Sequence, residues 1–156
     1  MFYNEQEEAL YFQRVKNVRD RLSRRFTPEW IAFDAEYFVT DEPVPFESRL
    51  DHTFTPIREG EQWGTSWQCS WFKLTGKVPA DWAGKEVIAD LDVGGEGLVF
   101  LPDGTALQGI TDGSVFYGNL SSRPHVRLID AARGGEDVEL WLDGACNAIF
   151  GITPEG

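Results

Sequence analysis

Cysteine and histidine are scarce in this chain, with two residues of each type among 156. Cys69 and Cys146 lie far apart, and neither belongs to a Cys-x-x-Cys or Cys/His cluster, so no zinc motif is present. Two buried thiols of a cytosolic protein are favoured over a disulfide between them. His52 and His125 have no second histidine at metal-ligand spacing, and the serines lack a nucleophile elbow. The sequence therefore indicates no catalytic and no metal-binding residue in this chain.

Basic residues are also few. The chain has 14 lysines and arginines against 26 aspartates and glutamates, which gives a formal net charge of −12. An acidic surface disfavours nucleic acid as a partner, because phosphates require a basic footprint. An anionic membrane surface is disfavoured for the same reason. A neutral ligand such as a sugar stays compatible with this charge.

Long hydrophobic runs are missing as well. No segment approaches the roughly 20 apolar residues that span a bilayer. The first residues, MFYNEQEEAL, lack the apolar core of a signal peptide. These features predict a cytoplasmic protein that does not enter a membrane.

The first segment is predicted to be an amphipathic helix, because no glycine or proline occurs between Asn4 and Phe26. Acidic residues come first and arginines last, which complements the helix dipole. We assign residues 1–27 to this helix and residues 28–156 to a second domain. Its basic face fits a solvated surface better than a docking site for an acidic partner. An apolar stripe recurs at steps of three and four: Tyr11, Val15, Val18, Leu22 and Phe26.

After Pro28 the hydrophobic pattern changes to a period of two, which is typical of strands. Asp103-Gly104 predicts a hairpin turn, and residues 34–47, which are acidic and contain prolines, are interpreted as an extended connection. Short strands at this spacing predict a mainly β fold, an antiparallel two-sheet jelly-roll sandwich of the galactose-binding-domain type. Eight strands are expected: Leu50–Ile57, Ser66–Gly76, Glu86–Val93, Leu98–Leu101, Ala106–Ile110, His125–Leu128, Val138–Leu142 and Ala148–Ile152.

Four of the six tryptophans fall between Glu59 and Val87. Trp63, Trp67 and Trp71 would line one face of a continuous strand, although Gly64 is expected to interrupt it. They could form a stacking platform for sugar rings, or they could fill the core and an interface, and the second interpretation is favoured. Together with Glu96 in the glycine-rich turn, these three tryptophans are the candidates for substrate binding or for a domain interface.

Several spaced motifs resemble the N-terminal region of class II α-mannosidases, the glycoside hydrolase family 38 enzymes of cytosolic type. The resemblance covers nearly the whole chain. The matching motifs are Pro56-Ile57, Glu59-Gly60-Glu61 before Trp63-Gly64, Trp71-Phe72-Lys73-Leu74, Val78-Pro79, Trp82-Ala83-Gly84-Lys85, the run from Val93 to Leu98, Asp103-Gly104, the run from Leu107 to Ile110, and the run from Ala132 to Glu136. The aromatic strand followed by Val-Pro-x-x-Trp-x-Gly-Lys is also similar to jelly-roll sugar-binding domains of other glycosidases.

The resemblance implies an accessory domain. In that family the chemistry belongs to a following α/β domain, which holds zinc through histidines and aspartates and carries an aspartate nucleophile. None of those motifs is present in this sequence, so no catalytic or metal residue carries over and no cofactor is expected in this segment. The implied partner is the protein's own C-terminal catalytic domain. An autonomous module that binds mannose-containing oligosaccharides is the alternative, and assembly into a homo-oligomer through the N-terminal helix is a third hypothesis.

Overall fold

The computed structural model describes residues 5–23, 29–111 and 122–147. The chain divides into two units, Met1–Ala32 and Phe33–Gly156. The described part of the first unit contains the helix α1 (Glu5–Ser23), which confirms the predicted helix over its central part. The beginning of the predicted helix, residues 1–4, and its end, residues 24–27, lie outside the described residues.

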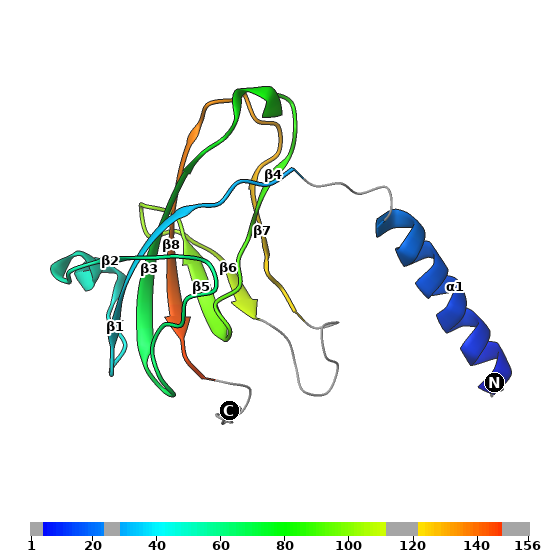
Figure 1. Cartoon of the computed structure of the whole chain (residues 1–156), viewed down its shortest axis with the longest axis horizontal. Coiled ribbons are helices and arrows are strands. Elements are labelled where there is room, and N and C mark those ends of the chain that lie inside the picture. Colours follow the sequence, from blue (N-terminus) through cyan, green and yellow to red (C-terminus); the bar gives the residue numbers. More distant parts are fainter. Residues whose placement is uncertain (1–4, 24–28, 112–121, 148–156) are drawn as a thin grey trace. The chain divides into compact units, whose positions relative to one another are not determined.

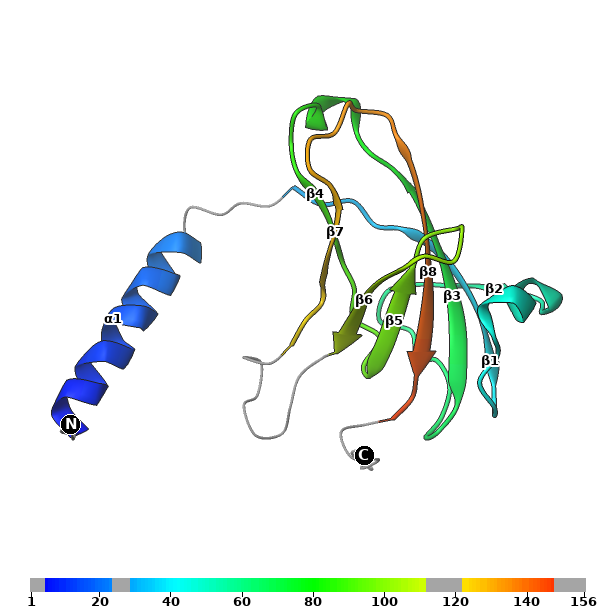
Figure 2. The same cartoon turned by 180° about the vertical axis from the view of Figure 1, so that it is seen from behind.

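The second unit is built from antiparallel strands, as predicted (Figures 1 and 2). One sheet has six strands in the order β2-β1-β3-β8-β5-β6, and the other pairs β4 with β7. The elements are β1 (Asp34–Thr40), the 3-10 helix η1 (Phe46–Asp51), β2 (Thr55–Ile57), β3 (Cys69–Lys77), the 3-10 helix η2 (Ala80–Trp82), β4 (Val87–Asp90), β5 (Glu96–Phe100), β6 (Ala106–Thr111), β7 (His125–Ile129) and β8 (Asp137–Ala145).

The long strands β3 and β8 form the centre of the larger sheet, paired from Cys69↔Ala145 to Lys77↔Asp137. Phe72 lies opposite Leu142, and alternation then places these side chains on the inner face of the sheet. The inner face packs against apolar residues of the smaller sheet and its flanks. The buried members of this core are Phe72, Leu74, Ala89, Leu91, Val99, Ile110, Val126, Leu140 and Leu142.

The opposite, outer face of the larger sheet is also partly buried. Phe38, Trp71 and Trp141 form a second cluster there, and the two indoles are each only 2% exposed. The cover is the segment of residues 41–54 between β1 and β2, here called the strap, which contributes Val44, Phe46 and Phe54. The strap therefore buries Trp141 on the face of β8 that would otherwise meet solvent.

Two predictions of secondary structure are wrong. Residues 34–40 form the strand β1, which pairs with β3 at seven positions, and are not a connection. Ala35 and Tyr37 pack against the core, while the acidic Asp34 and Glu36 stand on the outer face. The segment therefore alternates as a strand does, but its acidic residues suggested a connection. Leu50–Ile57 is a strand only at Thr55–Ile57, since η1 occupies the beginning of that range. The predicted strand Ala148–Ile152 lies outside the described residues.

The predicted hairpin at Asp103-Gly104 is confirmed. It joins β5 to β6, and Gly104 has a φ of 88°, a left-handed conformation that glycine adopts without a steric penalty. The Thr105 amide donates to Asp103 Oδ1 at 2.9 Å. This backbone hydrogen bond is the main reason that the pKa of Asp103 lies below its usual value.

Candidate interaction surface

Trp63 is a core residue. Its side chain is half-buried, and its Nε1–H donates to the Val93 carbonyl at 2.9 Å. Its ring meets Phe72 edge to face, with centroids 5.2 Å apart. The indole therefore helps close the inner core and satisfies its own donor within the domain.

Trp71 belongs to the other side of the sheet. It is 2% exposed, and its Nε1–H donates to the Val44 carbonyl of the strap at 2.8 Å. Trp63 and Trp71 thus lie on opposite faces, because a turn with positive φ at Gly64 and Trp67 separates Trp63 from the start of β3 at Cys69. The three tryptophans do not form one stacking platform, and the favoured interpretation as packing fits Trp63 and Trp71.

Trp67 is different, because its side chain is 65% exposed. Its φ of 74° makes it the one described residue other than glycine in the left-handed region. It occupies the third position of the turn from Thr65 to Gln68, which the Gln68 amide closes by donating to the Thr65 carbonyl at 3.0 Å. That position of such a turn normally requires glycine or asparagine. A bulky side chain there is a genuine conformational outlier.

Neighbouring hydrogen bonds hold this turn in place. The Trp67 amide donates to the Cys146 carbonyl at 2.8 Å, and the Cys146 amide donates to the Gln68 carbonyl at 2.9 Å. The Gln68 side chain accepts from the Thr65 amide at 2.8 Å and donates to Asp41 Oδ1 at 2.8 Å. These hydrogen bonds together hold Trp67 in its strained conformation.

Glu96, the fourth predicted candidate, begins β5 and is exposed. It lies opposite Ala145 of β8, and its Oε2 accepts from Asn147 Nδ2 at 3.3 Å. It therefore stands at the same end of the sheet as Trp67, whose amide bonds to Cys146. The structure brings these two candidates to one end of the sheet and keeps the other two inside the domain.

Sequence reasoning missed Asp143, which lies on β8 in register with Trp71 of β3 and Leu98 of β5. Its side chain is half-buried, and no hydrogen bond or ion pair to it is found in the described part of the chain. Burial raises the pKa of its carboxyl group. Burial also raises the pKa of the neighbouring Cys69 thiol, and the charges of Asp143 and Glu42 add to that effect.

Arg49 of η1 was missed as well. It is 7% exposed, and its guanidinium lies 3.5 Å from the centroid of the Phe46 ring and 4.2 Å from that of Trp141. Nη1 donates to the Phe46 carbonyl at 2.6 Å, while the buried Nε–H has no partner among the described residues. Desolvation lowers the pKa of Arg49, which the charges of Glu139 and Glu47 oppose. An arginine in a charged segment gave no signal that it would be buried, because the stack forms only when the strap folds over β8.

The histidines take structural positions. His52 stacks on Phe38, with ring centroids 4.3 Å apart, and His125 Nε2 lies 3.6 Å from Asp90 Oδ1. Within residues 5–23, 29–111 and 122–147, no three His, Cys, Asp or Glu side chains come together as a metal site would require. None of the described helices combines the length and the apolar character needed to cross a bilayer.

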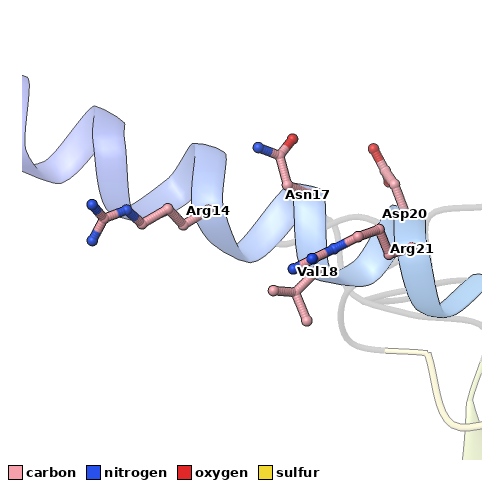
Figure 3. Close-up of a pocket in the computed structure, with 5 residues that line it drawn as sticks. All are labelled: Arg14, Asn17, Val18, Asp20 and Arg21. Carbon is pink, nitrogen blue, oxygen red and sulfur yellow. The ribbon is translucent and has the colours of Figure 1, made fainter.

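The first unit contains a depression along one side of α1 (Figure 3). All of its described lining residues belong to that helix, so no second element forms an opposite wall in the described structure. They are Arg14, Asn17, Val18, Asp20 and Arg21.

Residues 23–155 match the family model described as alpha-mannosidase, jelly roll domain. The chain belongs to this family. The jelly-roll domain is 31% identical over 115 residues to alpha-mannosidase G of Dictyostelium discoideum, covering 74% of this chain and 10% of that protein. It is 30% identical over 143 residues to alpha-mannosidase 2C1 of Homo sapiens, covering 91% of this chain and 13% of that protein.

The mouse alpha-mannosidase 2C1 is 32% identical over 115 residues, covering 73% of this chain and 10% of that protein. The jelly-roll domain thus spans about a tenth of the length of the curated relatives that it matches. The resemblance to α-mannosidases is confirmed, and so is the mainly β jelly-roll fold.

Proposed function

We propose that the jelly-roll domain is a non-catalytic N-terminal accessory domain of an α-mannosidase that hydrolyses terminal α-linked mannose. Family membership over residues 23–155 supports this, and the domain matches only about a tenth of each relative. In this proposal the domain packs against a zinc-dependent catalytic domain of the same polypeptide and supports its structure. The resemblance to the family implies that the zinc ligands belong to that catalytic domain.

The observation that carries the proposal is where the chemistry-bearing residues lie. Trp63 and Trp71 serve packing, with their Nε1–H groups bonded to the Val93 and Val44 carbonyls. The described histidines stack on an aromatic ring or face one carboxylate. These positions suit a scaffold more than a reaction centre. A cytoplasmic location stays a prediction within this proposal, as does assembly into a homo-oligomer.

The test compares the 156-residue chain with the full-length polypeptide in hydrolysis of an aryl α-mannoside. We expect no turnover by the 156 residues alone and strong turnover by the full-length protein supplied with zinc. Deleting residues 1–156 from the full-length protein should lower the temperature at which activity is lost. Hydrolysis by the isolated chain would overturn the non-catalytic assignment.

Carbohydrate binding by the domain itself is the second candidate, and exposed Trp67 is the observation that favours it. An exposed indole can stack on a sugar ring. If the domain binds mannosides, titration with a mannose-containing oligosaccharide should change its tryptophan fluorescence, and Trp67→Ala should abolish the change. Because Trp63 is bonded within the core, Trp63→Phe serves as the matched control and should retain the response. No response at millimolar sugar would count against this candidate.

A further inference from the structure

Two unfavourable features of the domain belong to segments that are hydrogen-bonded to each other, the turn before β3 and the end of β8. Trp67 holds a bulky, exposed side chain in a left-handed conformation, and Asp143 holds a half-buried carboxylate without a partner in the described structure. The backbone connects them, because the Trp67 amide bonds to Cys146, three residues beyond Asp143 on the same chain segment. Glycine in place of Trp67 would relieve the backbone strain, and an apolar residue in place of Asp143 would remove the unpaired charge. Neither feature benefits folding.

The backbone of Trp67 is bonded to Cys146, just beyond β8, and Asp143 stands on the outer face of that strand beside the strap-covered cluster. Strand pairing places Leu98 of β5 opposite Asp143 of β8. The next outward-facing row, nearer the end of β8, contains Cys69, Ala145 and Glu96. Leu98 is 37% exposed, in contrast to Trp71, which lies two strands away in the same row and is 2% exposed. We define the Trp67–Asp143 surface as Trp67, Cys69, Glu96, Leu98 and Asp143. It combines an exposed indole and an apolar side chain with two carboxylates.

We propose that the Trp67–Asp143 surface docks onto the catalytic domain of the same polypeptide, at a site where a lysine or arginine lies among apolar side chains. The inference rests on the proposed function, and it names the face and the chemistry of the contact. Charge complementarity supports it, because a half-buried carboxylate lacking a partner within the domain gains most from a cation supplied by another surface. The net charge of −12 likewise favours a basic counterpart. Trp67 would act as the aromatic anchor of the contact.

The experiment measures hydroxyl-radical oxidation of Trp67 in the full-length polypeptide, followed by mass spectrometry of its peptide. We expect slow oxidation in the wild-type protein, although the side chain is 65% exposed in the domain. Asp143→Lys should place like charges at the contact and raise the oxidation rate of Trp67 several-fold. Asp81→Lys is the matched control, since Asp81 is an exposed carboxylate in η2, which follows the opposite end of β3 (Figure 1). It should leave the rate unchanged.

Each outcome is decisive. Equal and fast oxidation of Trp67 in wild-type and Asp143→Lys proteins would overturn the docking surface, even if the full-length protein hydrolyses α-mannosides. Protection that appears only after a mannoside is added would also overturn it and assign the surface to sugar binding. An absence of mannosidase activity in the full-length protein would instead overturn the proposed function. Because activity and oxidation are measured separately, the two failures are distinguishable.

Discussion

Replacing Arg49 tests how the strap is held on the outer face of the sheet. The guanidinium stacks on Phe46 at 3.5 Å and on Trp141 at 4.2 Å, and it donates one hydrogen bond to the Phe46 carbonyl. Arg49→Ala removes both stacking contacts, that hydrogen bond and the packing of the aliphatic stem. We expect the strap to loosen and the aromatic cluster beneath it to become exposed to water.

The size of the effect follows from these contacts. Each buried cation–π contact contributes about 1 kcal/mol, and a hydrogen bond from a charged donor about 2 kcal/mol. Burying the unpartnered Nε–H costs about 1 kcal/mol, which the substitution recovers. Arg49→Ala should therefore lower the free energy of unfolding by about 3 kcal/mol, or the Tm by roughly 10 °C for a domain of this size. Arg49→Met keeps the stem and removes a buried charge, so its loss should be about 1 kcal/mol.

Urea denaturation followed by circular dichroism measures both variants, with Arg58→Ala as the control. Arg58 is exposed, so its substitution should change the free energy of unfolding by less than about 0.5 kcal/mol. An Arg49→Ala variant as stable as this control would show that the Arg49 contacts do not hold the strap. An equal loss in Arg49→Met and Arg49→Ala would show that the charged head alone, and not the stem, holds the strap.

Three other perturbations have expected outcomes. Trp67→Gly should raise the free energy of unfolding by about 1 kcal/mol, because it relieves a left-handed conformation, whereas Trp67→Ala should not, and urea denaturation measures both. Gly134→Ala should lower the Tm more than Gly135→Ala, since both residues have positive φ but only the first would place a Cβ 2.6 Å from the Ala80 carbonyl oxygen. Asp143→Asn should be more stable than wild type at pH 7. Burial raises the folded pKa of Asp143, so the ionised carboxylate costs stability above that pKa, and the advantage should disappear as the pH falls toward the unfolded value of about 3.9. A difference in the free energy of unfolding between Asp143→Asn and wild type that stayed constant from pH 3.5 to 7 would contradict this.

The sequence allowed prediction of the local features whose signals lie within a few residues. The alternation of Val87 and Ala89 with Ile88 and Asp90 predicts a strand with one buried face, and the structure buries the first pair and exposes the second. Asp103-Gly104 specifies a turn through backbone conformations open to glycine. Such signals do not reveal whether a second layer covers the other face. The burial of Trp141 was therefore not predictable from its own strand.

In the candidate surface, too, the sequence identified some residues, and the arrangement of distant segments was needed for the others. Sequence reasoning identified Trp67 and Glu96 as possible contacts, but it grouped them with Trp63 and Trp71, which the structure buries in two different clusters. Asp143 had no distinguishing signal among 26 acidic residues. It stands out only because β3 and β5 flank β8 at that position and leave the carboxylate half-buried without a partner in the described chain.

The helix, most strands, the hairpin turn and the α-mannosidase family can be recognised in the amino-acid sequence alone, because they depend on periodicity, turn chemistry and spaced motifs. Which faces are buried, where Arg49 stacks and which tryptophan stays exposed are visible only in the folded domain. Burial depends on segments that are distant in the chain, such as the strap over β8. The environment of a side chain is set by those long-range contacts, and a local pattern does not contain them.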